Sequence, residues 1–219
     1  NISRTYDMHG AEVRALDGVS LHVDPGEFIA ITGPSGSGKS TLLNVLGCLD
    51  RPDAGSYVLD GQEVSRLDDE AISTVRNRKI GFIFQSFHLL PRLTVLENVM
   101  LPLRFTREPK PDVTARAKEL LTRVGLADRM DHRPTQLSGG QMQRAAIARS
   151  LILSPALLLA DEPTGNLDSK SAADVLNLLD ELHAQGQTIV LVTHDNDIAA
   201  HAPRHVRLRD GKVESDAKR

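Results

Sequence analysis

Cysteine and aromatic residues are scarce in this chain of 219 residues, which has one cysteine, no tryptophan, two tyrosines and five phenylalanines. With Cys48 alone it can form no internal disulfide and no Cys-based zinc site, which fits a reducing compartment. Because Cys48 lies in an apolar helical stretch, we expect it to be a small buried hydrophobe and not a nucleophile. No apolar run approaches the roughly 20 residues needed to cross a bilayer. The chain starts at Asn1 without a basic or apolar leader, so we expect no export signal.

An excess of positive charge is also missing, since 26 Lys and Arg face 29 Asp and Glu, giving a net charge of −3. Together with the few aromatic residues available for base stacking, this balance argues against a nucleic-acid partner. The composition, 40% hydrophobic and 25% charged, is typical of a soluble globular protein. The length suffices for a real core in one or two closely packed lobes.

Short apolar runs mark the expected core. Glu27 to Thr32 predicts a strand that runs into a glycine-rich loop and then into a helix, whose leucines keep helical spacing to Leu49. Three more runs, at 80–84, 156–160 and 188–192, are apolar without alternation, and each ends at a polar residue. Continuous apolarity predicts strands buried on both faces, and hence a mainly parallel sheet covered by helices.

Two Asp-Gly pairs mark expected hairpins. The segment 56–64 turns at Asp60-Gly61, and the segment 205–214 turns at Asp210-Gly211. Asp-Gly suits the positive φ angles of tight hairpin turns. We therefore expect antiparallel strands at the edges of the core.

The segment between the expected sheet strands is mostly helical in pattern. Between Ser86 and Arg149 an apolar stripe runs from 113 to 124, and Gly125 is expected to end that helix. A further helical stripe runs over 175–182. The middle block therefore predicts a helical insertion in an α/β core.

One motif points directly to phosphate chemistry, because it matches G-x-x-x-x-G-K-[ST] between an expected strand and an expected helix. Its glycines let backbone N–H groups close around phosphate oxygens, and the helix N-terminus adds partial positive charge. We expect Lys39 to reach the β and γ phosphates and the Ser40 hydroxyl to ligate Mg²⁺. By chance the pattern should occur in on the order of 1% of chains this long, before the flanking elements are required. The phosphate-binding candidates are Gly33, Pro34, Ser35, Gly36, Ser37, Gly38, Lys39, Ser40 and Thr41.

An acidic pair follows the run at 156–160 directly. Asp161 is placed to hold the metal through water, and Glu162 is placed to face the γ-phosphate as a base. An isolated Asp-Glu pair is usually the solvated start of a helix. After a buried strand, in a chain with a phosphate-binding loop, the pair predicts hydrolytic competence.

A second glycine-rich segment, Leu137-Ser138-Gly139-Gly140-Gln141, precedes an apolar helix. Ser138 and Gln141 have the spacing of a capping box, so one interpretation is a well-capped helix with a flexible start. The other interpretation is functional, because two glycines expose backbone N–H groups and the helix end offers a second anion site.

These ordered motifs resemble the nucleotide-binding subunit of ATP-binding cassette (ABC) transporters, over essentially the whole chain. Further matching positions are Gln85 after a strand, Asn166-Leu167-Asp168, and His194 at the end of a strand. The resemblance implies a P-loop NTPase core with a mainly parallel sheet, an antiparallel β edge subdomain and an inserted helical subdomain. We expect one domain over 1–219, divided into an α/β core (1–85 and 150–219) and a helical part (86–149).

The resemblance also implies a homodimer closed head to tail around ATP and Mg²⁺. Ser138 and Gly140 of one chain, with Gly139 and Gln141 beside them, then contact the γ-phosphate held by Lys39 of the other. Dimerisation is therefore part of the active site that we expect.

Four other positions gain roles from the resemblance alone. Gln85 matches a lid glutamine that senses Mg²⁺ and the attacking water, and Asp168 matches a residue that couples the two sites across the dimer. His194 matches a switch histidine that contacts the γ-phosphate and helps hold Glu162. Tyr6 matches an aromatic under adenine, although packing in an edge strand is the alternative.

Within the ABC group, the segments 87–91, 93–94, 97–99 and 163–168 resemble cassettes of the lipoprotein-release, macrolide-efflux and cell-division type. We therefore expect an integral membrane permease as partner, docked near residues 85–97 on the cytoplasmic face of the inner membrane. The apolar residues expected there, with core packing as the alternative, are Phe87, Leu89, Leu90 and Leu93. A signalling cassette that moves no cargo, or a soluble ABC ATPase acting on nucleic acid or cofactor assembly, are the alternatives.

Overall fold

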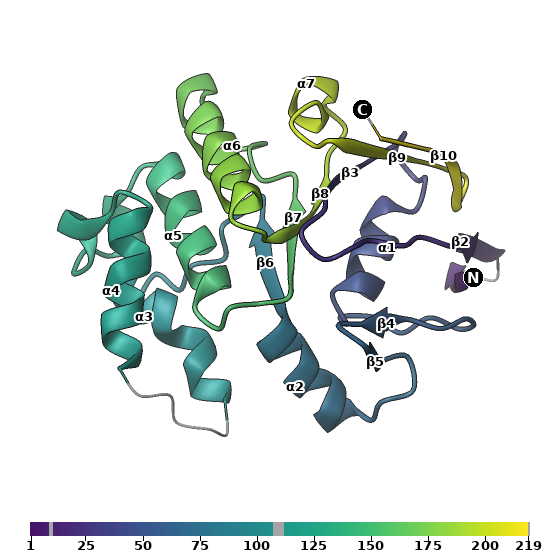
Figure 1. The fold of residues 1–219 in the computed structure, drawn as a ribbon, viewed down its shortest axis with the longest axis horizontal. Coiled ribbons are helices and arrows are strands. Elements are labelled where there is room, and N and C mark those ends of the chain that lie inside the picture. Colours follow the sequence, from purple (N-terminus) through teal and green to yellow (C-terminus); the bar gives the residue numbers. More distant parts are fainter. Residues whose placement is uncertain (9–10, 107–111, 219) are drawn as a thin grey trace.

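The described residues, 1–8, 11–106 and 112–218, form in this computed structural model a six-stranded central sheet in the order β10-β9-β3-β8-β7-β6 (Figure 1). Strands β9, β3, β8, β7 and β6 run parallel to one another, and β10 pairs antiparallel with β9 at one edge. The mainly parallel sheet with an antiparallel edge is therefore confirmed. The bounds are Phe28–Thr32 for β3, Ile80–Phe84 for β6, Leu157–Asp161 for β7, Thr188–Val192 for β8, Arg204–Arg209 for β9 and Lys212–Lys218 for β10.

The central strands are buried on both faces, because successive side chains of a strand point to opposite sides. In β7, Leu158 and Ala160 belong to one hydrophobic core, whereas Leu157 and Leu159 belong to the other. All four side chains are at most 6% exposed. Two cores thus explain why the strand sequences are apolar without alternation.

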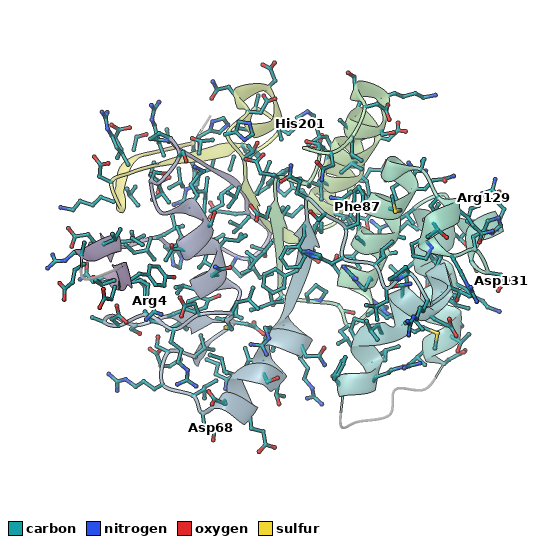
Figure 2. All side chains as sticks on the ribbon, turned by 180° about the vertical axis from the view of Figure 1, so that it is seen from behind. Arg4, Asp68, Phe87, Arg129, Asp131 and His201 are labelled. Atoms are coloured by element: carbon teal, nitrogen blue, oxygen red, sulfur yellow. The ribbon has the colours of Figure 1, made fainter. Side chains whose placement is uncertain are left out.

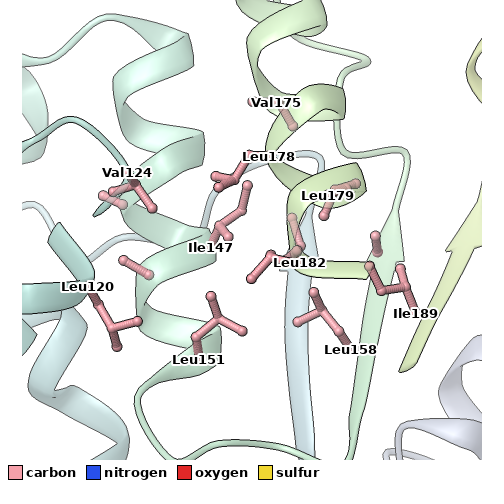
Figure 3. Close-up of a cluster of buried hydrophobic side chains, with 14 of the residues drawn as sticks. Leu120, Val124, Ile147, Leu151, Leu158, Val175, Leu178, Leu179, Leu182 and Ile189 are labelled. Carbon is pink, nitrogen blue, oxygen red and sulfur yellow. The ribbon is translucent and has the colours of Figure 1, made fainter. Parts of the chain in front are cut away.

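Four helices contribute to the first core, two lying against the sheet and two packed on these beyond its β6 edge, in the left and upper parts of Figure 1. Each fully buried aliphatic side chain in this core contributes about 1.5–3 kcal/mol. Figure 3 shows Ile147 and Leu151 packed toward Leu178, Leu182 and Leu158 in this core. The helices are α3 (Val95–Met100), α4 (Val113–Arg123), α5 (Gly139–Leu151) and α6 (Ser169–Ala184), with short 3₁₀ turns η1 (Leu101–Phe105), η2 (Ala127–Arg129) and η3 (Pro134–Gln136).

The second face is covered by α1 and α2 and by the amino-terminal hairpin, which supplies Leu16 and Val19 to the second core. The short α7 (Asn196–Ala199) follows β8. The remaining bounds are Lys39–Leu46 for α1, Asp69–Lys79 for α2, Ile2–Met8 for β1, Ala11–Val19 for β2, Val58–Leu59 for β4 and Gln62–Glu63 for β5.

Both Asp-Gly turns form as predicted. Asp60 and Gly61 have φ angles of 47° and 77° between β4 and β5, and Asp210 and Gly211 have 47° and 73° between β9 and β10. Two consecutive positive φ angles match the right-handed twist of the flanking strands. Glycine at the second position adopts this conformation without strain.

Other expectations need adjustment. The first helix was expected to reach Leu49 but ends at Leu46, and Leu49 is 49% exposed. The strand expected at 156–160 begins and ends one residue later, so Asp161 is its last residue. Helix α2 and the β1–β2 hairpin were not predicted.

Cys48 is 4% exposed, as expected for a small buried hydrophobe, and burial raises the pKa of its thiol to about 11. Such a thiol is almost entirely protonated near neutral pH, so it is a poor nucleophile. Among the described residues, no helix combines the length and the apolar character needed to cross a membrane.

Candidate functional site

Four neighbouring parallel strands, β3, β8, β7 and β6, end at the same edge of the sheet. Ligand sites of open α/β sheets lie outside such carboxyl ends. The predicted site residues at these ends are Gly33 after β3, His194 near the end of β8, Asp161 at the end of β7 and Gln85 after β6, and Thr193 lies between β8 and His194.

The loop between β3 and α1 has the geometry of a phosphate cradle. The ammonium group of Lys39 donates hydrogen bonds to the carbonyl oxygens of Gly33 (2.8 Å) and Pro34 (2.9 Å), which holds its charge at the loop. Gly38, the residue before α1, has a φ of 98°, and a Cβ there would lie 2.3 Å from the carbonyl oxygen of Ala15. Both the backbone angle and the close approach require glycine at this position.

The donors around this loop fit a triphosphate with a hard divalent cation. Helix α1 begins without a side-chain cap, which leaves its N-terminal end available to an anion. The hydroxyl of Ser40 and the carboxylate of Asp161 are oxygen ligands of the kind that Mg²⁺ prefers. Burial raises the pKa of the Asp161 carboxyl, the charge of Glu162 raises it further, and Lys39 opposes the rise. A bound cation would favour the ionised carboxylate in the same way as Lys39.

Glu162 is held in place by its neighbours from β8. Its Oε2 accepts a hydrogen bond from Thr193 Oγ1 (2.9 Å), and its Oε1 accepts one from the backbone N–H of His194 (2.9 Å). The Nδ1 atom of His194 lies 2.6 Å from the same Oε1. This hydrogen bond and the negative charge of Glu162 raise the pKa of His194.

The backbone at Glu162 supports this orientation. Its N–H donates to the carbonyl oxygen of Val192 (2.9 Å), and its φ of 44° lies in the left-handed region. A non-glycine residue in this region is strained, and such strain clusters at functional sites. The side chain is 18% exposed, so the carboxylate is both restrained and accessible.

Gln85 lies against the segment that follows Glu162. The backbone carbonyl of Gln85 accepts a hydrogen bond from Asn166 Nδ2 (3.1 Å), and a Cβ on Gly165 would lie 2.6 Å from Gln85 Nε2. The structure thus places Gln85, Asp161, Glu162 and the loop from 163 to 168 in one neighbourhood.

The second glycine-rich segment forms the predicted capping box. Ser138 N–H donates to Gln141 Oε1 (2.9 Å), and Gln141 N–H donates to Ser138 Oγ (3.3 Å). Gly140 permits close packing on α6, because a Cβ there would lie 2.7 Å from Ser171 Oγ. Helices α5 and α1 pack in opposite cores, so the chain carries its two glycine-rich helix starts on different faces of the sheet.

Asp168 is the N-cap of α6, where its Oδ1 accepts from Ser171 N–H (3.0 Å) and its Oδ2 accepts from Ser171 Oγ (2.7 Å). These hydrogen bonds lower the pKa of Asp168. Its predicted coupling role across a dimer stays a prediction, because the capping contacts are all within one chain.

Tyr6 lies in strand β1 of the β1–β2 hairpin, the strand in which Figure 2 labels Arg4. Its hydroxyl donates to Asp50 Oδ2 (2.6 Å), and the Arg4 guanidinium lies 4.8 Å from the ring centroid. This is the edge-strand packing considered as an alternative. Stacking on adenine stays a prediction.

The expected docking residues are only partly exposed. Leu90 is 45% exposed, whereas Leu89 packs against the helical core, and neither lines the large groove of the molecule. That groove, of about 940 Å³, lies between α2, β6, the turn η1 and the end of α5. Its apolar lining includes Leu49, Phe82, Phe84, Pro102, Phe105 and Ile152, and Phe105 is 73% exposed. The groove joins segments from distant parts of the chain, so no local pattern indicated it.

Two polar side chains of α5, Gln143 and Arg149, contact the backbone around the end of β6 and were not predicted to be functional. Gln143 is fully buried. A signal for it was present, because helical spacing puts Gln143 in line with the apolar residues Ile147 and Leu151.

Comparison with known proteins agrees with this geometry. The family model described as ABC transporter matches residues 16–165. An uncharacterized ABC transporter ATP-binding protein of Thermotoga maritima is 53% identical over 219 residues, covering 100% of this chain and 94% of that protein. The macrolide export ATP-binding/permease protein MacB of Chlorobaculum tepidum is 51% identical over 219 residues, covering 100% of this chain but 34% of MacB.

Solved structures give the same result. A dimeric structure of MJ0796, a bacterial ABC transporter cassette, has a TM-score of 0.90 and 46% identity, covering 100% of this chain and 96% of that one. A dimeric post-hydrolysis state of MJ0796 bound to ADP and Pi has a TM-score of 0.89. The chain therefore belongs to the ABC transporter family, as an ATP-hydrolysing ATP-binding cassette.

Proposed function

We propose that this cassette closes head to tail with a second copy, and that the two ATP molecules held between them drive a membrane permease. The observation that carries this proposal is the placement of α1 and α5 in opposite cores, which directs the two glycine-rich helix starts of one chain toward two different ATP molecules. The dimeric structures of MJ0796 support it, because that related cassette assembles in pairs.

In each site, backbone amides of the loop 33–38 and the ammonium of Lys39 bind the phosphates of one ATP. Ser138 and Gly140 of the second copy contact the γ-phosphate through the N-terminus of α5. The nucleotide then joins two surfaces that belong to different chains.

Ser40, Asp161 and Gln85 would hold Mg²⁺, which when bound would neutralise part of the phosphate charge. Glu162 accepts a proton from the attacking water, while Thr193 and His194 keep its carboxylate oriented. Loss of the shared γ-phosphate removes the contact between the copies and lets them separate.

The permease partner is inferred from the MacB relative, whose name joins an ATP-binding part to a permease. We propose an export role of the macrolide, lipoprotein or peptide type, on the cytoplasmic face of the membrane. A cytoplasmic segment of the permease fits the groove between α2, β6 and η1, whose exposed Phe105 and Leu49 need an apolar cover.

A mixing experiment tests the shared site. Lys39→Ala disables the phosphate loop, and Ser138→Arg blocks the start of α5, so each variant alone should be inactive. In an equal mixture, half of the dimers contain both variants, and each of these has one intact site of two. The mixture should therefore recover about a quarter of wild-type ATPase activity if the sites act independently. No recovery, with both variants folded and mixed dimers present, would contradict the head-to-tail arrangement.

A further inference from the structure

A buried amide connects α5 to the two loops that carry proposed catalytic groups. Gln143 on α5 is 0% exposed, and its Nε2 donates to the carbonyl oxygens of Pro163 (2.6 Å) and Phe84 (3.2 Å). Pro163 follows Glu162, and Phe84 precedes Gln85. One side chain thus holds the main chain beside the proposed base and beside the proposed lid glutamine.

The chemistry of the contact fixes the orientation of the amide. Both neighbours are carbonyl acceptors, so only the NH₂ group of Gln143 can face them. Within the described part of the chain, Gln143 Oε1 is buried without a hydrogen-bond partner, as is Oγ1 of Thr164, the residue after Pro163. Buried polar atoms without partners are rare in folded proteins, and each needs a reason to persist. A site that rearranges during its cycle supplies such a reason.

Arg149, farther along α5, holds the far end of the loop that follows β6. Its guanidinium donates to the carbonyl oxygens of Phe87 (2.8 Å) and His88, and burial lowers its pKa. Phe87, labelled near the middle of Figure 2, and His88 have positive φ angles of 58° and 49°. The segment after β6 is therefore fixed to α5 at both ends, through Gln143 before Gln85 and through Arg149 after it.

We propose that Gln143 is a positioning residue for hydrolysis, which transmits the placement of α5 to Glu162 and Gln85. In the proposed dimer, α5 begins with the segment that contacts the second copy's ATP. The hydrogen bonds of Gln143 therefore align the proposed base only when the start of α5 is bound to that ATP. The inference rests on the proposed roles of Glu162 and Gln85. Gln143 acts through the two backbone carbonyl groups that it holds.

The first test replaces Gln143 with Met, which has similar length and no donor. Single-chain affinity for ADP should stay within about twofold, whereas kcat should fall about tenfold with little change in KM, because binding groups are intact and the base is displaced. The matched control is Gln187→Met. Gln187 Nε2 also donates to two carbonyls, of Pro155 and Thr188 (3.2 Å each), but at the opposite ends of the strands. Its kcat per folded molecule should stay within about twofold of wild type.

A pH profile separates positioning from packing. In Gln143→Glu an ionised carboxylate cannot donate to either carbonyl, whereas its protonated form can donate to one. The kcat deficit of this variant should therefore shrink between about pH 8 and pH 6, while that of Gln143→Met stays constant.

Two results would overturn the inference. One is a kcat for Gln143→Met within about twofold of wild type after correction for the folded fraction. The other is a loss of kcat no larger than that of Gln187→Met. A Glu162→Gln variant that hydrolyses ATP normally would instead contradict the proposed base, whatever the Gln143 variants show.

Discussion

Replacing Glu162 with Gln removes one negative charge and changes little else in the site. The amide oxygen can still accept the two hydrogen bonds from His194, while the bond from Thr193 must reverse or be lost. Hydrogen bonds to a charged group are roughly twice as strong as neutral ones, so unfolding free energy should fall by about 1–2 kcal/mol. Removal of a general base typically lowers the rate about 10²–10⁴-fold, which corresponds to roughly 3–5 kcal/mol of barrier. Catalysis should therefore fall much further than stability.

Three measurements on the same preparation test this expectation. Phosphate release at saturating ATP gives the rate, and urea denaturation gives the unfolding free energy. NMR of the imidazole gives the pKa of His194, which should fall toward 6.5, because the negative charge is removed and the hydrogen bond from His194 then goes to a neutral amide oxygen. Light scattering should also show an ATP-dependent dimer, since the binding groups remain.

The control is Asp180→Asn, because Asp180 Oδ2 lies 2.8 Å from His201 Nδ1 in a similar pair away from the strand ends. That variant should keep its ATPase rate within about twofold. If Glu162→Gln retains more than about a tenth of the wild-type rate while the pKa of His194 falls as expected, then Glu162 orients His194 but is not the base.

Three further changes have defined outcomes. In Gly38→Ala the added Cβ would lie 2.3 Å from the carbonyl oxygen of Ala15, which forces the loop to shift. The variant should lose about 2–4 kcal/mol of unfolding free energy in urea titrations and should not bind a fluorescent ATP analogue. The pKa of His194 is raised in the folded state, so its pairing with Glu162 stabilises the fold. This contribution to the unfolding free energy is complete below about pH 6.5 and is lost as the pH rises through the folded-state pKa. The stability difference between wild type and His194→Ala should therefore shrink from about pH 6 to pH 9. Asn98→Ala should cost about 2–4 kcal/mol by calorimetry but leave ATPase per folded molecule unchanged, because this buried amide bonds only loop and helix backbone.

The central sheet was predictable because burial on both faces leaves a local mark. The runs 80–84 and 188–192 match β6 and β8 residue for residue. The hairpins were predictable for a different reason, since Asp-Gly favours a backbone angle that few other pairs tolerate. In both cases a property of consecutive residues determines the structure.

Elements with weak local patterns were missed. Helix α2 buries only Ile72 and Val75 among its eleven residues, so it shows no broad apolar stripe. Strand β2 is mostly exposed, and its buried residues, Leu16 and Val19, do not follow the two-residue alternation typical of a strand. The positions of α2 and β2 therefore depend on contacts with residues that are distant in the sequence.

The site was predictable to the level of strand ends. Parallel strands place the residues after them at one edge, so Gln85, Asp161, Glu162 and His194 could be grouped without knowledge of the strand order. The hydrogen bonds among these residues could not be predicted, because the pairing of Glu162 with His194 requires β7 and β8 to be neighbours in one register.

The proposed docking surface could not be predicted from local sequence patterns. Phe87 and Leu89 were expected near a partner's docking site, with core packing as the alternative, and Leu89 packs against the helical core. The exposed apolar surface instead comes from Leu49, Phe105 and their neighbours in the groove, which are far apart in sequence. Phe105 is 73% exposed, and a partner bound in the groove would cover apolar area of this side chain that now faces water. The same reasoning links the groove to hydrolysis, because Arg149 lines it and also holds the loop after Gln85. A partner bound in the groove would contact His88 and Arg149, and Gln143 on the same helix holds the backbone next to the proposed base Glu162.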